Sequence, residues 1–189
     1  DVVVATKGGL FRQGDTYLPA GRPEVIRQHC ETSLRLLETD CLDLFQLHTV
    51  DPDVPLVETM GAFADLKTEG KIRYVGLSNV SSDQLTEAQQ VVAVDCVQNH
   101  LSPLALGDLP TVRRCADQAI AYLAYAPLGG GGRAKSIGDL HPALAKVAAE
   151  RDETVQRIAL AWLLHLSPNV LVITGATTPE SVKASAAAA

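Results

Sequence analysis

The sequence predicts an α/β protein with a parallel sheet, built as a (β/α)₈ TIM barrel whose first two strand–helix units are absent from the chain. Apolar, β-branched runs alternate with stretches of helical periodicity along all 189 residues. No break in composition divides them, so we expect a single domain over residues 1–189. A full barrel takes ~250 residues, so about six of its eight units fit this length.

Composition excludes several classes of partner. Hydrophobic residues make up 47% and charged residues 20% of the chain, which is typical of a globular domain with one sizeable core. The net charge of −6 and the lack of Lys/Arg clusters longer than two residues argue against nucleic acids and anionic membranes. Without an apolar run of about 20 residues or a signal-like start, a soluble, cytoplasmic protein that binds small molecules is expected.

The cysteines carry no metal or redox signature. Cys30, Cys41, Cys96 and Cys115 lie far apart and form no C-x-x-C pair. We expect buried free thiols, no disulfide and no metal site.

The first half of the chain reads as three strand–helix units. Residues 2–6 are too apolar to alternate, as in a strand covered on both faces, and a Gly/Pro-containing loop leads to a helix over 23–38. A strand over 42–48 precedes a helix that Asp53, Val54 and Pro55 open and Gly70 ends. Residues 72–78 form the next strand, and Ser82 caps a short helix that runs to about 90. The apolar stripes of the two long helices comprise Ile26, Cys30, Leu34 and Leu37 in the first and Leu56, Met60, Phe63 and Leu66 in the second.

The second half continues the alternation. Strands are expected over 92–98, 119–127 and 169–175, and helices over 108–117, 142–151 and 154–166. A last helix begins at Pro179 and runs into the alanines 186–189.

Polar residues end these strands, where a parallel barrel carries its reactive groups. They are Lys7, His48, Ser78 with Asn79, Gln98 with Asn99, Tyr125 and the Thr174–Gly175 turn. Four of these positions also have a structural alternative. Lys7 is then a lysine that extends from the barrel mouth, His48 a satisfied core residue, Tyr125 a core aromatic, and Ser78–Asn79 a turn and helix cap.

The glycine run at 129–132 also has two interpretations. It directly follows a strand, so its bare backbone N–H groups suit a pyrophosphate, but it lacks the G-x-G-x-x-G pattern and is equally typical of a flexible linker.

Taken together, these positions resemble the aldo-keto reductases, in particular the branch related to potassium-channel β-subunits and bacterial oxidoreductases. Residues 33–79 resemble the family's S-L-x-R-L-x-x-D-x-x-D-L-x-x-x-H and G-K-I-R-x-x-G-x-S-N signatures in order and separation. VVVATKGG, VDCVQNHLSP, AYAPLGGG and VITGATTPE resemble further family landmarks, so the resemblance covers nearly the whole chain.

The resemblance implies an NADPH-using oxidoreductase that reduces aldehydes or ketones, with NADH left open. A tyrosine donates the proton, Lys7 lowers the pKa of that tyrosine, and His48 holds the carbonyl oxygen. Ser78, Asn79 and Gln98 would grip the nicotinamide carboxamide, and Tyr125 would stack on its ring. The remaining cofactor-binding positions would be Ala126, Pro127, Leu128 and Gly129 at the pyrophosphate, and Gly175, Ala176, Thr177, Ser181 and Ser185 toward the adenosine.

The sequence departs from the family pattern in two places. The family's acid tyrosine and the aspartate that pairs with its lysine precede the ATKGG strand, so we expect an N-terminal piece beyond this chain. At the adenosine end the usual basic residue after I-P-G is missing, and Lys183 is the alternative partner for a 2′-phosphate.

Three functions therefore remain: a carbonyl reductase, a nicotinamide-binding regulatory or auxiliary protein of the same fold, and an unrelated phosphate-binding barrel in which Lys7 forms a Schiff base.

Overall fold

The computed structural model describes residues 2–130 and 132–189, so Gly131 of the predicted glycine run lies outside the described residues. The chain divides into two compact units, Asp1–Val97 and Gln98–Ala189, and each is described by itself. A single domain over residues 1–189 stays a prediction. Within the described ranges, no helix combines the length and the apolar character that crossing a membrane requires.

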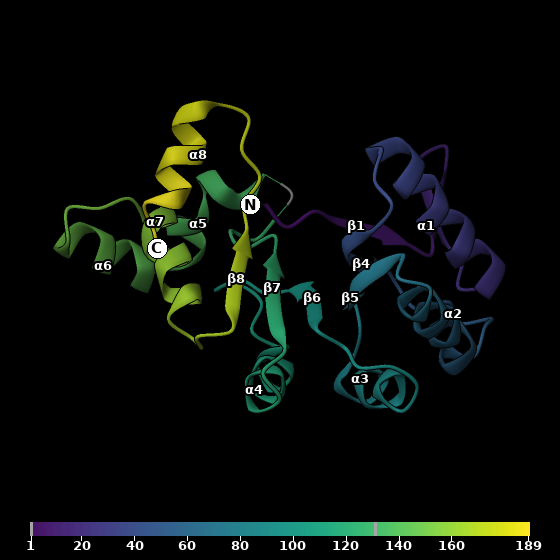
Figure 1. Ribbon diagram of the computed structural model, residues 1–189. Coiled ribbons are helices and arrows are strands. Elements are labelled where there is room, and N and C mark those ends of the chain that lie inside the picture. Colours follow the sequence, from purple (N-terminus) through teal and green to yellow (C-terminus); the bar gives the residue numbers. More distant parts are fainter. Residues whose placement is uncertain (1, 131) are drawn as a thin grey trace. The chain divides into compact units, whose positions relative to one another are not determined.

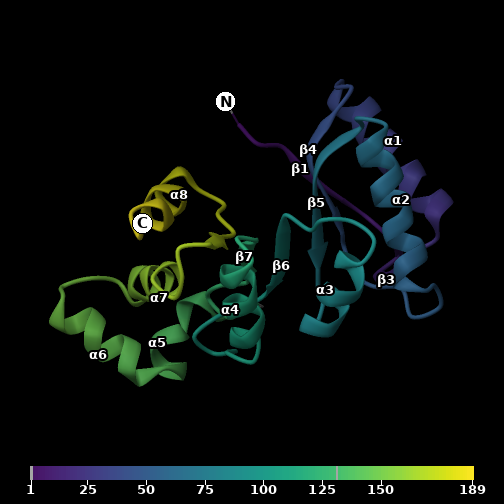
Figure 2. The same cartoon turned by 60° about the horizontal axis from the view of Figure 1, so that its bottom comes forward.

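The first unit contains a parallel sheet. Strand β4 pairs with β1 on one side and with β5 on the other, both in parallel. The helices α1 and α2 pack against each other, and they contact β1 and β5 respectively (Figures 1 and 2). The elements of this unit are β1 (Ala5–Gly8), β2 (Leu10–Gln13), β3 (Thr16–Pro19), α1 (Pro23–Leu37), β4 (Leu42–Leu47), α2 (Leu56–Thr68), β5 (Ile72–Ser78) and α3 (Ser82–Gln89). Strand β6 (Cys96–His100) spans the boundary between the units.

The predicted apolar stripes form the interface between helices and sheet. All four stripe residues of α2 are buried, and Phe63 stacks on Phe45 of β4 with 5.1 Å between the ring centroids. In α1 the stripe is buried except at Leu37, which is 46% exposed. The prediction was wrong there because α1 ends at Leu37 and Glu38 turns into the left-handed region at φ 53°.

The first strand is shorter and less covered than predicted. The strand begins at Ala5, and the preceding Val2, Val3 and Val4 are 85%, 70% and 42% exposed. In the observed register Ala5 lies opposite Leu44, so Val3 and Val2 would lie opposite the start of β4 and the turn before it. The N–H of Val4 donates to the carboxylate of Asp43 at 3.0 Å instead of to the backbone of β4, so the regular ladder begins only after Val4.

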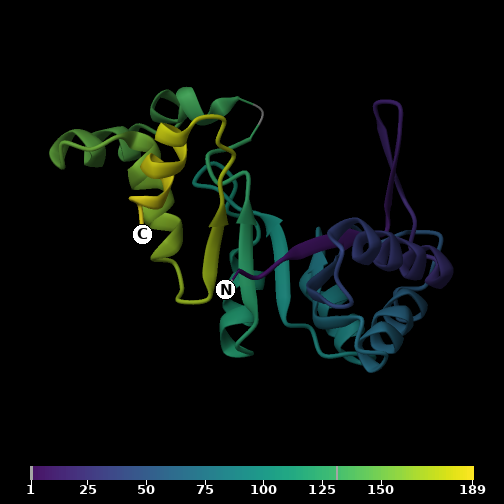
Figure 3. The same cartoon turned by 45° about the horizontal axis from the view of Figure 1, so that its top comes forward.

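The loop predicted after the first strand contains a hairpin. Strands β2 and β3 pair antiparallel around Gly14–Asp15, and Figure 3 shows this segment, in purple, extending away from α1. A Gly-Asp pair between two short runs of β-forming residues is a hairpin signal in the sequence.

Several element boundaries also differ from the predictions. Helix α2 begins at Leu56, since Asp53 donates its N–H to the carboxylate of Asp51 instead of opening the helix. Ser81, not Ser82, caps α3 by accepting the N–H of Gln84. The strand predicted over 92–98 is β6, displaced toward the C-terminus.

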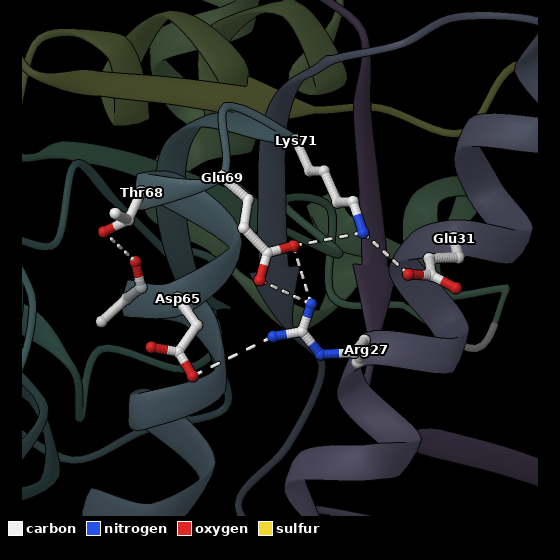
Figure 4. A network of polar contacts seen from close by, with 7 residues as sticks. Arg27, Glu31, Asp65, Thr68, Glu69 and Lys71 are labelled. Atoms are coloured by element: carbon white, nitrogen blue, oxygen red, sulfur yellow. Dashed lines mark hydrogen bonds and ion pairs between the residues drawn. The ribbon is translucent and has the colours of Figure 1, made fainter.

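A surface network of charges joins α1 to α2 and the residue before β5 (Figure 4). Arg27 donates to both carboxylate oxygens of Glu69 at 2.8 Å, and Lys71 bridges Glu69 and Glu31 at 3.1 and 2.8 Å. These hydrogen bonds, from Arg27 first and Lys71 second, hold the pKa of Glu69 below its ordinary value. The network's contribution to stability is therefore lost as the pH falls through that lowered pKa.

The second unit pairs β7 with β8 in parallel and places α7 beside β8 (Figure 1). Its elements are α4 (Leu109–Asp117), β7 (Ala121–Tyr125), the 3₁₀ turn η1 (Arg133–Lys135), α5 (Ile137–Leu140), α6 (Pro142–Glu150), α7 (Val155–Leu164), β8 (Val170–Ile173) and α8 (Pro179–Ala186). The predicted helices and strands are present, whereas η1 and α5 were not predicted. Ile137 of α5 is fully buried in a small cluster with Leu144 and Ala159.

In the first unit, the segment between β3 and α1 is tied to the loop after β4 and to α2. The N–H of Gly21 donates to the carboxylate of Asp51 at 2.8 Å, and the hydroxyl of Thr59 donates to the carbonyl of Gly21 at 2.7 Å. Thr59 is 1% exposed, so its hydroxyl and the carbonyl that it meets have little access to water.

We predict that Thr59→Val destabilises the intact protein by about 1–3 kcal/mol, because it leaves the Gly21 carbonyl without its donor. The matched control is Thr68→Val on the same helix, whose exposed hydroxyl donates to the Ala64 carbonyl and whose loss is expected to cost less than about 0.5 kcal/mol. Denaturant midpoints measure both changes. Equal midpoints for the two variants would contradict a structural role for the Thr59 bond.

Candidate functional site

The first unit brings Lys7 and His48 to the same end of its sheet. Lys7 lies opposite Gln46 in the parallel register, and the N–H of His48 donates to the carbonyl of Gly8 at 2.9 Å. The β1–β4 ladder therefore continues to the residue that follows β4, and His48 lies two residues beyond Gln46, the partner of Lys7.

Alternation along the strands separates the two faces of this sheet. Thr6 and Phe45 face the helices, since Thr6 contacts Ser33 of α1 and Phe45 stacks on α2. Lys7 therefore faces the other side, as does Gln46, whose side-chain amide lies 3.8 Å from the sulfur of Cys96. His48 follows Gln46 by two residues, so its side chain is expected on the same face of the sheet as Gln46 and Lys7.

Burial and neighbouring charges shift the pKa values of both Lys7 and His48. Burial lowers the pKa of Lys7, and the nearby Cys96 opposes this shift. Burial also lowers the pKa of His48, and the positive charge of Lys7 lowers it further. The geometry thus favours a neutral imidazole beside an amine whose charge is partly desolvated.

Ser78 and Asn79 join this end of the sheet. Ser78 ends β5 and is 1% exposed, while Asn79 follows it at φ 57°. The Asn79 amide donates to the carbonyl of His48 at 3.0 Å and to the hydroxyl of Ser78 at 3.1 Å. Asn79 therefore links the ends of β4 and β5, and its role as a nicotinamide contact stays a prediction.

The remaining predicted site residues belong to the second unit. Gln98 lies in β6 and is 9% exposed, and Tyr125 ends β7. The ring of Tyr125 stacks on His100 with 5.5 Å between centroids and 23° between planes. Burial raises the pKa of the Tyr125 phenol, and the charge of Asp108 adds to the shift, so Tyr125 is a neutral aromatic surface at ordinary pH.

A cavity of about 210 Å³ opens where β7 and β8 end. Three of the four residues predicted at the pyrophosphate line it, together with Gly175 from the turn after β8. Among the described residues, its lining is Ala126, Pro127, Leu128, Gly130, Gly132, Ala134, Ile173, Thr174 and Gly175. Gly129 is not among the lining residues, and a Cβ there would lie 2.9 Å from Leu104.

The lining of this cavity fits a cofactor phosphate. Ala126, Gly130 and Gly132 all have positive φ values, of 49°, 63° and 82°, so the loop turns its backbone repeatedly within seven residues. Loops that turn in this way present N–H groups to an anion without interfering side chains. A Cβ on Gly175 would meet no heavy atom within 4 Å, which leaves the space in front of it free.

The residues after Gly175 lead into α8, and their role as cofactor contacts stays a prediction. Ala176 and Thr177 are exposed and precede α8. The hydroxyl of Ser181 is engaged in capping this helix, because it donates to the Thr178 carbonyl at 2.8 Å and accepts the Thr178 N–H at 3.2 Å. Ser181 would have to exchange these bonds to hold a cofactor. Ser185 lies one helical turn further along α8.

Asp108 forms a polar cluster that the sequence did not reveal. Its carboxylate accepts hydrogen bonds from Tyr122 at 2.6 Å, Thr111 at 2.6 Å and Asn99 at 2.8 Å. These donors come from β7, α4 and β6, so the cluster fixes the strands that carry Gln98 and Tyr125. The pKa of Tyr122 is raised, by burial first and by this carboxylate second, which keeps the phenol protonated as the donor.

The predicted burial of the cysteines holds for three of the four. Cys30, Cys96 and Cys115 are buried and Cys41 is partly buried, and none of the four forms a disulfide among the described residues. Burial raises the pKa of Cys30 and of Cys115 to about 11, so both are unreactive thiols at ordinary pH.

Comparison with known proteins identifies the family. Residues 1–189 match the model of the Aldo/keto reductase family. The chain is 37% identical over 188 residues to "Uncharacterized oxidoreductase C215.11c" of Schizosaccharomyces pombe, covering 97% of this chain and 60% of that protein. It is 31% identical over 217 residues to the NADH-specific methylglyoxal reductase of Escherichia coli, covering 99% and 67%.

A solved structure agrees with the fold prediction. The chain resembles the aldo-keto reductase from Klebsiella pneumoniae in complex with NADPH, with a TM-score of 0.79 and 31% identity over 99% of this chain and 64% of that one. The predicted fold class, a (β/α)₈ barrel of which the chain covers a part, is confirmed. The hypothesis of an unrelated phosphate-binding barrel was wrong.

We predict that Lys7→Met raises the pKa of His48 toward its ordinary value of 6.5, since the variant removes the positive charge that disfavours the imidazolium. Burial remains, so the pKa stays below 6.5. NMR titration of the histidine ring signals measures the change. Lys67→Met is the control, because Lys67 pairs with Asp95 and does not contribute to the shift at His48. An unmoved His48 titration would show that Lys7 lies outside electrostatic reach.

Proposed function

The chain belongs to the aldo/keto reductase family, and on that premise we propose that the complete protein is an oxidoreductase that reduces aldehyde or ketone carbonyls with NADPH. The chain spans 60 to 67% of the length of the curated relatives named above, so the proposal concerns the complete protein. A small-molecule carbonyl compound as substrate and a cytoplasmic location are parts of the same proposal.

The observation that supports this function best is the pairing of Lys7 with His48. Two titratable groups lie at one strand end, both with a lowered pKa, and the charge of one acts on the other. Groups whose pKa values are displaced by burial and by a specific neighbour are typical of catalytic sites. A lysine that simply extended into water would keep its ordinary pKa.

The two side chains suit different parts of carbonyl reduction. Neutral His48 carries one ring N–H, which can donate to a carbonyl oxygen and hold it as negative charge develops there. The cation of Lys7 would stabilise the phenolate of a nearby tyrosine, and so lower the pKa of the phenol that gives a proton to the oxygen. We assign this tyrosine to the part of the protein outside these 189 residues.

The cofactor would be held mainly by the second unit. When bound, a nicotinamide cofactor supplies the hydride that the carbonyl carbon requires. The loop from Ala126 to Gly130 and the turn at Gly175 would receive the pyrophosphate, and Tyr125 would offer its ring to the nicotinamide. Lys183 on α8 is the proposed partner of the 2′-phosphate, which makes NADPH the proposed cofactor.

We predict that the complete protein oxidises NADPH in the presence of aldehydes, and that Lys7→Met lowers kcat by about 10²–10⁴-fold. This is the range that general acid catalysis usually supplies. The dissociation constant of NADPH should stay nearly unchanged, because Lys7 acts on the proton donor and not on the cofactor. Stopped-flow absorbance measures turnover, and cofactor fluorescence measures binding.

His48→Gln provides a comparison within the same experiment. It should lower kcat/KM by an amount that varies among substrates, since it disturbs the orientation of the carbonyl. Near-normal turnover of Lys7→Met would refute the role of Lys7. A wild-type protein that binds NADPH but shows no carbonyl-dependent oxidation across a broad aldehyde panel would favour a regulatory or auxiliary protein.

We further predict that Gly175→Val raises the dissociation constant of NADPH by about ten- to a hundredfold, which corresponds to the 1–3 kcal/mol typical of overfilling a packed site. The added side chain enters open space, so the denaturant midpoint should not change. Gly107→Val is the control, because a side chain there also meets no heavy atom within 4 Å but does not line the cavity. Unaltered NADPH binding by Gly175→Val would place the phosphates elsewhere.

A further inference from the structure

Helix α1 contacts β1 on both sides of Lys7. His29 and Ser33 lie one helical turn apart on the face of α1 that meets the strand. The ring Nδ1 of His29 accepts the N–H of Gly9 at 3.0 Å, and the hydroxyl of Ser33 lies 3.4 Å from that of Thr6. Ser33 also donates to the carbonyl of His29 at 2.9 Å.

The bond from Gly9 to His29 holds the chain where it leaves the strand. Gly9 has a φ of 83°, and a Cβ there would lie 2.6 Å from Leu47, so only glycine fits this turn. Its carbonyl accepts the N–H of Ala20 at 3.0 Å, which closes the base of the β2–β3 hairpin. Both the N–H and the carbonyl of Gly9 are thus hydrogen-bonded. His29 contributes a side-chain atom to these bonds, and Ala20 contributes its backbone N–H.

The neighbouring Gly8 connects this turn to the candidate catalytic pair. Its carbonyl accepts the N–H of His48 at 2.9 Å, and Lys7 immediately precedes it. A displacement of the Gly8–Gly9 turn would therefore move Lys7 and the backbone of His48 together.

The ring of His29 is suited to this contact only in its neutral form. Nδ1 must be unprotonated to accept an N–H, so the ring proton belongs on Nε2. Phe11 of the hairpin packs edge-on against the ring, with 4.8 Å between centroids and 81° between planes. Burial lowers the pKa of His29, which favours this neutral state.

We propose that His29 is a positioning residue: its neutral imidazole fixes the Gly8–Gly9 turn and thereby holds Lys7 and His48 in the geometry that carbonyl reduction requires. The proposal rests on the proposed function, since it assumes that Lys7 and His48 act on the reaction. It assigns to α1 a role in the chemistry in addition to packing against the sheet.

The proposal implies a dependence on pH. As the pH falls through the lowered pKa of His29, the ring gains a proton on Nδ1 and can no longer accept from Gly9. Few charges face the ring. Lys7 of β1 points to the opposite side of the sheet, and Arg12 of the hairpin binds the Gly14 carbonyl and Asp15. Burial is the cause of the shift at His29, with no ionised side chain among the described residues contributing.

The test compares His29→Leu with His29→Asn in the complete protein. Leucine keeps the apolar volume and removes the acceptor, so kcat should fall about ten- to a hundredfold, the loss expected when catalytic groups shift by about 1 Å. The amide oxygen of asparagine can replace Nδ1 and does not titrate. His29→Asn should therefore restore kcat to within about threefold of wild type, and the ratio of wild-type to variant kcat should fall as the pH drops through the lowered pKa of His29.

A second measurement separates positioning from stability. Hydrogen exchange of the Gly9 amide should be slow in wild type and His29→Asn and fast in His29→Leu, and the pKa of His48 should move in His29→Leu alone. His165→Asn, at the exposed end of α7, is the control for loss of a histidine and should change none of these quantities.

The outcomes distinguish the two proposals. Fast exchange at Gly9 in His29→Leu together with an unchanged kcat would overturn the positioning role. Absence of carbonyl-dependent turnover in wild type would contradict the proposed function alone. In that case the His48 titration still decides: a shift in His29→Leu supports the positioning of Lys7 and His48, and no shift overturns it.

Discussion

The hydrogen bond from the His48 N–H to the Gly8 carbonyl, 2.9 Å long, is the contact on which the candidate catalytic site depends. It continues the parallel ladder beyond the last residue of β4, and so ties the backbones that carry Lys7 and His48. A ladder of this kind allows only small displacements along the strand, since a shift of one residue would reverse every side chain between the two faces. The register of the backbone therefore brings Lys7 and His48 to the same end of the sheet. A hydrogen bond between their side chains is not required.

Burial has the largest influence on the pKa values of Lys7 and His48, and neighbouring charges come second. For His48 the two causes act in the same direction, so the imidazole is held neutral by its surroundings and by Lys7. For Lys7 burial acts against its charge, and Cys96 offers only partial compensation. A desolvated cation is stabilised by any partner that acquires negative charge, which is what a phenol does when it gives up its proton. The arrangement thus explains why a lysine at this strand end is suited to tuning an acid.

The sequence predicted those features that depend on periodicity and order along the chain. The buried stripe of α2 and the strand ends at Lys7 and His48 follow from regular spacing, which local sequence specifies directly. Contacts between distant residues were not predictable in the same way. His29 and Gly9 are 20 residues apart and Asp108 and Tyr122 are 14 apart, and neither pair belongs to a spacing rule. The β2–β3 hairpin was missed although its Gly14–Asp15 turn was visible, because a loop between a strand and a helix was the simpler expectation.

The candidate catalytic site at Lys7 and the cavity at Gly175 differ in which substitutions they tolerate, because different groups line them. At the end of β1 the functional groups are side chains, and each is held by neighbours that are themselves packed, such as Gly9 against Leu47. At the ends of β7 and β8, five of the nine lining residues named above are glycine or alanine, with Ala126 and Gly175 at the cavity beside larger residues such as Leu128. A substitution near Lys7 therefore has to keep the functional side chains in their positions. A substitution near Gly175 has to keep the cavity open. Under the proposed function, the preference for a cofactor phosphate would then depend on residues such as Lys183 of α8 and not on the residues that hold Lys7 and His48.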